Sequence, residues 1–207
     1  MRTPLLPLVL SLFPILLCGC ERRDDPPAVT SVPVSTPADA FFAALSTLCG
    51  QAYAGALTVS DARDRETFAG TPVAHVRECS DAEIRIPLHV GEDRSRTWVV
   101  SRVDGGLRLK HDHRHRDGSE DRLTWYGGDS LDGGSGTATR QAFPADAESK
   151  ALFLQAGLTA SVDNIWALEV EPGERLAYEL RRPDRHFRIE FDLSRPVDAP
   201  PPPWGHD

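Results

Sequence analysis

The chain has 207 residues, of which 40% are hydrophobic and 26% are charged, and its formal net charge at neutral pH is −8. This length allows one domain with appended segments, and the composition is that of an ordinary globular body. The acidic balance argues against nucleic acid as a partner, because phosphate binding requires a basic footprint. Lys110 and Lys150 are the only lysines, so arginine carries nearly all the positive charge.

The first twenty residues have the form of a bacterial export signal. Arg2 precedes an apolar run, Leu5–Leu17, which is too short to span a bilayer and has the proportions of the hydrophobic part of a signal peptide. The sequence Leu17-Cys18-Gly19-Cys20 then resembles the lipobox of bacterial lipoproteins. This resemblance implies cleavage after Gly19 and attachment of lipid to Cys20, whereas the alternative is an ordinary secreted protein.

The residue after Cys20 bears on the destination of such a lipoprotein. In bacterial lipoproteins an aspartate at this position favours retention in the inner membrane, and this chain has Glu21 instead. The resemblance therefore implies an outer-membrane protein that faces the periplasm and contacts the membrane through its N-terminal lipid. The charged, proline-rich segment that continues to Thr36 has little to bury and predicts a tether.

Two cysteines remain once the signal peptide and the lipidated residue are set aside. Cys49 and Cys79 would be exported to an oxidising compartment, where two thiols are expected to form a disulfide. The closed loop of about 30 residues would stabilise the fold by on the order of 3–4 kcal/mol in the chain-entropy description. The alternative is a pair of buried free thiols.

A helix is predicted directly after the tether. Thr36 is a suitable N-cap and Pro37 suits the first helical position. Apolar residues recur at helical spacing through the segment. They are Phe41, Phe42, Leu45, Leu48, Cys49 and Ala52. The pattern predicts a helix from Pro37 to Tyr53.

Beyond this helix the hydrophobic period changes to two, which is typical of half-buried strands. The predicted strands are residues 82–90, 96–103, 107–115, 120–127, 164–171, 175–182 and 186–193. A turn at Asp104-Gly105-Gly106 predicts a hairpin, residues 127–136 read as a glycine-rich loop, and a short helix is expected around Asp146 to Ala156. The pattern predicts one domain, residues 37–196, that is an antiparallel β-barrel or strongly bent sheet with an N-terminal helix and one inserted helix. Residues 197–207 are expected to be a disordered proline-rich tail.

Three histidines at alternate positions give the strand 107–115 an unusual face. On a strand, residues two apart share a face, so His111, His113 and His115 continue the face that begins with Leu109. The turn at Arg116–Ser119 would place His115 opposite Glu120. The predicted face is therefore apolar at one end and carries imidazoles and a carboxylate at the other.

This face has three interpretations. In the first, His111, His113, His115 and Glu120 bind a divalent transition metal, and the spacing from His113 through Glu120 to Gly127 resembles the first motif of cupins. That resemblance implies a cupin-like metal-dependent enzyme. In the second, the hairpin is solvated and its histidines face water. In the third, the histidines bind an anionic ligand together with Arg122, which the predicted register places opposite His113.

The leading hypothesis is a lipid-anchored cell-envelope protein with a binding or structural role, without a cofactor or catalytic residues. The body resembles a family of bacterial envelope proteins for which no activity is known. The alternatives are the cupin-like metalloenzyme and a calycin-type barrel that carries a small apolar ligand. The sequence does not indicate whether the partner is a protein or a small molecule.

Overall fold

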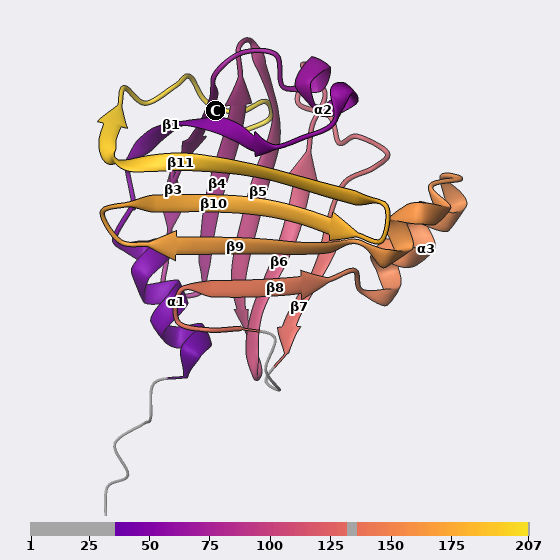
Figure 1. The fold of residues 1–207 in the computed structure, drawn as a ribbon, viewed down its shortest axis with the longest axis horizontal. Helices are drawn as coiled ribbons and strands as arrows, with labels where there is room; N and C mark the ends of the chain where they lie inside the picture. Colours follow the sequence, from indigo (N-terminus) through magenta and orange to yellow (C-terminus); the bar gives the residue numbers. More distant parts are fainter. Residues whose placement is uncertain (1–35, 132–135, 207) are drawn as a thin grey trace, which may run out of the picture. The chain divides into compact units, whose positions relative to one another are not determined.

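The structure is a computed structural model that describes residues 36–131 and 136–206 (Figure 1). The predicted signal peptide, Cys20 and the tether up to residue 35 lie outside the described residues. Within the described part of the chain, no helix has both the length and the apolar character needed to cross a bilayer.

The described residues form strands and a few short helices. The helices are α1 (Pro37–Ser46), α2 (Ala62–Thr67), α3 (Ala147–Gln155) and the 3-10 helix η1 (Thr159–Asp163). The strands of the first half are β1 (Ala52–Val59), β2 (Pro72–His75), β3 (Glu78–Cys79), β4 (Glu83–Val90), β5 (Asp93–Val103) and β6 (Gly106–His113). The strands of the second half are β7 (Tyr126–Leu131), β8 (Arg140–Pro144), β9 (Ile165–Glu171), β10 (Arg175–Arg182) and β11 (Arg185–Val197).

All these strands belong to one antiparallel sheet in the order β7-β6-β5-β4-β2-β1-β11-β10-β9-β8, with the short β3 paired to β4. Figure 1 shows the sheet bent onto itself: β8 to β11 cross in front of β4 to β7 at a steep angle. The predicted fold class is therefore confirmed as a nearly closed antiparallel barrel with an N-terminal helix and an inserted helix.

The two end strands of the sheet, β7 and β8, meet at a seam that glycine makes possible. A Cβ atom at Gly128 would lie 1.8 Å from the carbonyl oxygen of Pro144. The backbone N–H of Asp146 donates to the carbonyl oxygen of Gly127 at 2.9 Å. Ser149 Oγ accepts from Gly127 N at 2.7 Å and donates to Gly127 O at 3.0 Å. Hydrogen bonds from the start of α3 to Gly127 thus hold the two end strands of the sheet together. Residues Tyr126–Leu131, predicted as the end of a strand and the start of a loop, form β7 instead.

Helix α1 begins as predicted but ends earlier. The Thr36 side chain accepts from the backbone N–H of Asp39, and Asp39 in turn accepts from the backbone of Thr36, which completes a capping box. The helix stops at Ser46, and the chain turns through Gly50 in the left-handed region at φ 81°. Tyr53, predicted as the last helical residue, lies in β1. Half of the predicted apolar stripe therefore belongs to a turn and a strand.

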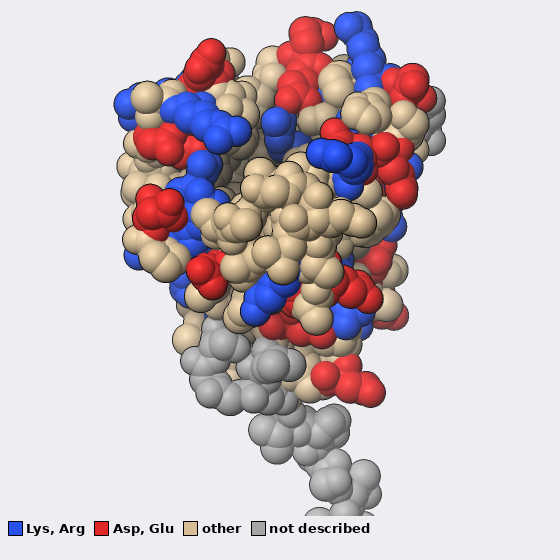
Figure 2. Space-filling view, turned by 90° about the vertical axis from the view of Figure 1, so that its right-hand side faces the viewer, with Lys and Arg blue, Asp and Glu red and all other residues tan. Residues whose placement is uncertain are grey.

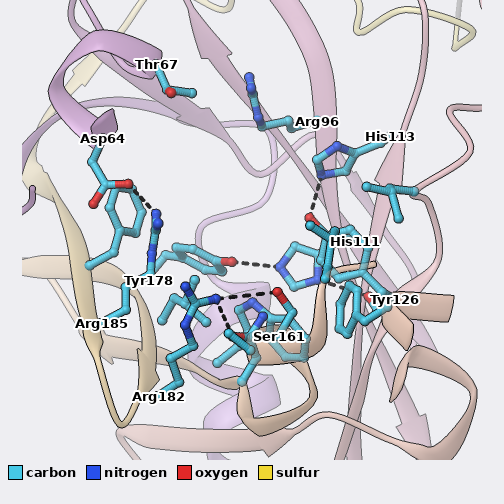
Figure 3. A pocket seen from close by; sticks show the side chains of 18 of the residues that line it. Asp64, Thr67, Arg96, His111, His113, Tyr126, Ser161, Tyr178, Arg182 and Arg185 are labelled. Carbon is cyan, nitrogen blue, oxygen red and sulfur yellow. Dashed lines mark hydrogen bonds and ion pairs between the residues drawn. The ribbon is translucent and has the colours of Figure 1, made fainter. Parts of the chain in front are cut away.

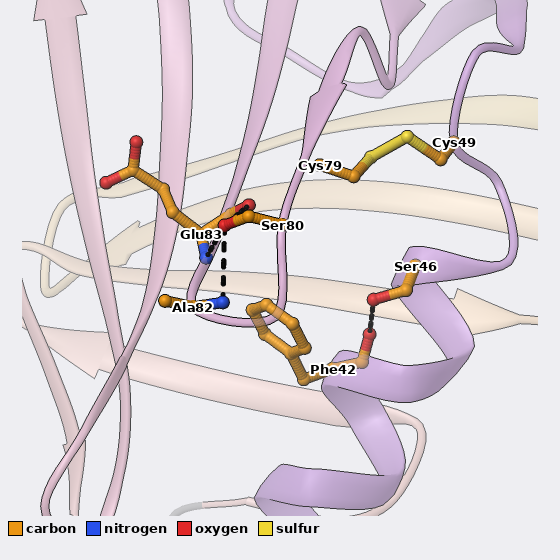
Figure 4. Close-up of a disulfide and its surroundings, with 7 residues drawn as sticks. All are labelled: Phe42, Ser46, Cys49, Cys79, Ser80, Ala82 and Glu83. Carbon is orange, nitrogen blue, oxygen red and sulfur yellow. Dashed lines mark hydrogen bonds between the residues drawn. A yellow bond between two sulfur atoms is a disulfide. The ribbon is translucent and has the colours of Figure 1, made fainter.

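The predicted disulfide between Cys49 and Cys79 is present, with the two Cα atoms 6.2 Å apart (Figure 4). Cys49 lies in the turn after α1, and Cys79 lies in β3. The bond therefore joins the end of the helix to a two-residue strand at the margin of the sheet.

The predicted meander of the last third is confirmed as β9, β10 and β11. Directly opposed pairs include Leu176 with Phe191 and Tyr178 with Ile189, and all four side chains are buried. Because opposed residues share a face, these rows form one wall of the barrel interior.

The described part of the C-terminal tail, residues 197–206, is not disordered as predicted, although it contains no helix or strand after Val197. Arg94 donates to the carbonyl oxygen of Pro202 at 3.1 Å, and the backbone N–H of Trp204 donates to Arg94 O at 3.1 Å. His206 Nε2 lies 2.9 Å from Oδ2 of the fully buried Asp112. Proline restricts the chain before it docks, so the proline-rich composition that suggested disorder also makes docking less costly in entropy.

A candidate ligand-binding cavity

The histidine segment does not form the predicted hairpin. His111 pairs with Tyr126, and an isolated bridge pairs Arg114 with Glu120, so the predicted pairing of His115 with Glu120 is wrong. The segment Asp121–Trp125 leaves the sheet instead of continuing as a strand. Two local features account for this departure. Asp121 accepts from the backbone N–H of Leu123 at 2.7 Å, and Trp125 adopts a left-handed backbone at φ 56°.

The four predicted metal ligands are consequently not brought together. His111 and His113 point into the barrel, whereas the His115 side chain is 57% exposed. Glu120 accepts from Trp125 Nε1 at 2.9 Å. Among residues 36–131 and 136–206, no three His, Cys, Asp or Glu side chains form a group that could hold a metal ion. The solvated-hairpin interpretation does not describe His111, which is buried, or His113, which is partly buried and lines the same pocket.

His111 and His113 line a cavity of about 600 Å³ inside the barrel (Figure 3). This volume lies within the range of small-molecule binding sites in proteins. Residues of α2 and η1 border it, so the cavity lies where these two short elements flank the sheet. Its aromatic lining consists of Phe68, Trp98, Tyr126, Phe153, Trp166, Tyr178 and Phe187. The wall is rigid where rings stack, as Trp98 and Tyr178 do with centroids 4.4 Å apart.

The inward row of each strand changes from apolar to polar along the barrel. On β5 and β6 the opposed pairs run from Val100 with Leu109, through Trp98 with His111, to Arg96 with His113. Arg96 thus occupies the place opposite His113 that the sequence analysis gave to Arg122. Arg122 is exposed and lies outside the cavity lining.

The same change occurs on the facing wall. On β10 and β11, Leu180 is opposed to Phe187, and the next inward pair is Arg182 with Arg185. All four of these side chains line the cavity. The deep end of the cavity is therefore aromatic, and one end carries cations contributed by both walls.

Hydrogen bonds fix the protonation of His111 at the cavity floor. His111 Nδ1 lies 3.0 Å from the carbonyl oxygen of Tyr126, which can only accept, so Nδ1 carries the proton. Nε2 is then the acceptor for the Tyr178 hydroxyl at 2.8 Å. Burial lowers the pKa of His111 to about 3 and raises the pKa of Tyr178 well above its ordinary value. Both groups are uncharged at neutral pH.

His113 and Tyr126 form a second uncharged pair, with 3.0 Å between Nε2 and the phenolic oxygen. Burial, followed by the charge of Arg96, lowers the pKa of His113 to about 4, and burial raises the pKa of Tyr126. Neither pair titrates near neutral pH, where a general acid or base works best. The arrangement supplies fixed hydrogen-bond partners to a ligand rather than a proton-transfer group.

Charged side chains gather at the rim of the cavity. Figure 2 shows a hollow bordered by positively charged side chains above a central uncharged area. The charged residues that line the cavity are Arg63, Arg96, Arg182, Arg185, Asp64 and Asp121. With the histidines neutral, cations outnumber anions around this cavity, although the whole chain is acidic.

Sequence reasoning singled out His111 and His113 but missed the arginines and the aromatic wall. A signal was present, because the inward rows at Trp98, Tyr178 and Phe187 each end in an arginine on the same face. What the sequence did not show was that rows from β5 and β10, far apart in the chain, face one cavity.

No protein-family model matches the chain, and neither the curated proteins nor the solved structures yielded a significant match.

Proposed function

We propose that the protein is a lipid-anchored component of the bacterial cell envelope whose barrel binds a small molecule with an apolar body. The observation that carries this proposal is the cavity of about 600 Å³ walled by seven aromatic side chains. A concave pocket of this size, walled mainly by aromatic side chains and carrying a few polar groups, has the usual form of a small-molecule site.

The polar groups of the cavity favour binding over the alternative of a metalloenzyme. Ligand sites are typically apolar with a small number of fixed polar groups that set orientation. The His111–Tyr178 and His113–Tyr126 pairs meet this description, because each imidazole is hydrogen-bonded to its tyrosine and burial keeps it neutral by lowering its pKa. The metal-dependent reading requires a ligand set that these side chains do not assemble.

A neutral fluorescent probe such as N-phenylnaphthylamine tests the proposal. Its fluorescence should rise on binding, with energy transfer from Trp98 and Trp166 at the cavity wall. Leu180 lines the cavity, so Leu180→Trp should fill part of it and weaken probe binding by about tenfold, roughly 1.4 kcal/mol. Leu154→Trp is the matched control, since Leu154 is 57% exposed and lies outside the lining.

Failure of the probe to bind at concentrations of tens of micromolar would contradict the proposal. Equal weakening by Leu180→Trp and Leu154→Trp would show that the probe binds a surface rather than the cavity. Organic extraction of freshly purified protein, followed by mass spectrometry, is expected to release a small apolar compound.

Membrane anchoring is tested separately at Cys20. Cys20→Ser should leave the protein without lipid and move it from the membrane fraction to the soluble fraction, because the fatty-acyl chains supply the membrane affinity. Cys18→Ser is the control and should stay membrane-bound, since Cys18 leaves with the signal peptide. Labelled fatty acid in the Cys20→Ser protein would overturn the lipobox interpretation.

A further inference from the structure

We infer that the ligand carries an anionic head group, such as a carboxylate, which binds between Arg96, Arg182 and Arg185 at the rim while the apolar body occupies the aromatic interior. This inference rests on the proposed function and narrows the class of ligand to anionic amphiphiles.

The first support is a cross-strand pair of like charges. Arg182 on β10 and Arg185 on β11 are directly opposed at the end of their hairpin, and both side chains line the cavity. Like charges in this position destabilise a sheet. Both side chains are also largely buried, at 18% and 20% exposed. A repulsive pair turned into a cavity is the arrangement expected where an anion binds between the two guanidinium groups.

The second support is the hydrogen-bonding capacity left on these arginines. Arg182 pairs with Asp184 at 2.9 Å, and its Nη1 also makes long hydrogen bonds to Ser161 Oγ at 3.4 Å and Asn164 Oδ1 at 3.5 Å. Arg185 pairs with Asp64, with Asp61 farther away at 4.0 Å. A guanidinium group has five donor hydrogens, so one carboxylate does not saturate it. Nε of Arg185 is buried and has no hydrogen-bond partner within the described residues.

The third support comes from the opposite wall. Arg96 pairs with Asp93 through Nη1 at 2.5 Å, and its guanidinium carbon lies 5.4 Å from the centre of the Phe68 ring. It is opposed to His113, whose Nε2 is engaged by Tyr126. In Figure 3, Arg96 and His113 lie across the cavity from Arg182 and Arg185. A head group placed here would meet cations from two walls and a neutral imidazole.

Charge and polarity together set the orientation of the ligand. Four arginines but two aspartates line the cavity, and the carboxylates of Asp93 and Asp184 that pair with Arg96 and Arg182 lie outside this lining. The guanidinium groups are therefore the charges that mainly face a ligand, although the net charge of the protein is −8. Arginine is well suited to bind a carboxylate through two parallel hydrogen bonds. The aromatic interior holds no charge that could accept the head group, so the apolar body enters first.

The test compares dodecanoate with dodecanol, which differ in the head group and share the same chain, as competitors of the neutral probe at pH 7. Dodecanoate should bind at least about tenfold more tightly, and the difference should shrink as salt screens the charges. Arg182→Gln should remove most of this preference, and a single cooperative thermal unfolding transition shows that the variant is folded.

Arg181→Gln is the matched control, because Arg181 is the next residue on β10, is 56% exposed and pairs with Glu179 on the outer face. It removes the same charge from the protein and should keep the preference for the acid. Equal affinity for dodecanoate and dodecanol would overturn the head-group inference and leave the binding function standing. Loss of the preference for dodecanoate in Arg181→Gln would also overturn the head-group inference, because the overall electric field of the protein would then explain the preference without a specific site. If neither compound nor the probe binds, the proposed function itself fails.

Discussion

Lowering the pH from 7 to about 4.5 should reduce the free energy of unfolding by roughly 7 kcal/mol, because three largely buried histidines stay neutral in the fold. Burial is the main cause that lowers the pKa of His111 to about 3 and the pKa values of His113 and His89 to about 4. An unfolded histidine has a pKa of 6.5. Below pH 6.5 these histidines therefore bind protons in the unfolded chain but not in the folded chain.

The direction of the effect follows from proton binding. Consider a histidine whose pKa is lower in the folded state than in the unfolded state. Its contribution to the free energy of unfolding is fully present above the unfolded pKa and is lost as the pH falls from the unfolded pKa to the folded pKa. The loss is about 1.4 kcal/mol per pH unit for each histidine in that window. Carboxylates act at lower pH. Glu169, for example, has a pKa held below its ordinary 4.5 chiefly by the hydrogen bond from Arg188.

Urea unfolding at a series of pH values measures this effect. His113→Gln removes one of the three groups and should make the slope between pH 6.5 and 4.5 shallower by about 1.4 kcal/mol per pH unit. His115→Ala is the control, because its side chain is exposed to solvent, and it should leave the slope unchanged. A stability that is flat between pH 7 and 5 would contradict the neutral, buried state of these imidazoles.

The elements that could be predicted are those governed by local pattern. The Asp104-Gly105 turn links β5 to β6 with Val103 opposed to Gly106, as a two-residue hairpin requires. The meander of β9 to β11 follows from alternating apolar residues and short turns, and its three strands fall within the predicted ranges to within a few residues at their ends. Hydrophobic period and turn chemistry are properties of neighbouring residues, so the sequence displays them directly.

The elements that were mispredicted depend on distant contacts. Tyr126–Leu131 contains two glycines and little β propensity, yet it is a strand because it pairs with β6, and its glycine backbone also fits closely against Pro144 at the seam. Conversely, the apolar residues Leu123 and Trp125 suggested a strand that the structure replaces with a loop. Closure of a sheet into a barrel is a long-range event, and local pattern does not report it.

The candidate site also depends on long-range contacts that local sequence pattern does not report. Spacing correctly placed His111 and His113 on one face of a strand, but the environment of that face comes from elsewhere. Tyr178, which donates to His111, is 67 residues away in the chain. A histidine among such partners is a neutral hydrogen-bonding group, whereas in the predicted hairpin it would be a ligand or a solvated cation. The chemistry of the site is therefore set by β10 and β11 as much as by the histidines.

Removing the disulfide should destabilise the protein by about 3–4 kcal/mol, because the bond closes a 30-residue loop. The local structure gives β3 little other support, since it has two residues, both exposed, paired only with β4. Beyond it, Ser80 Oγ accepts from the backbone of Ala82 at 3.2 Å and of Glu83 at 3.0 Å, which holds the following turn. Figure 4 shows that these contacts lie beside the bond.

The Cys49→Ala, Cys79→Ala double variant measures this contribution by urea unfolding against the oxidised protein, whose intact mass should be about two protons lighter than the reduced form. Neither cysteine lines the cavity, so the folded double variant should bind the neutral probe with the affinity of the parent. Loss of stability without loss of binding would assign the bond to the fold alone. An unfolding free energy unchanged by the double substitution would contradict its stabilising role, and weaker probe binding would show that the end of α1 and β3 also maintain the cavity.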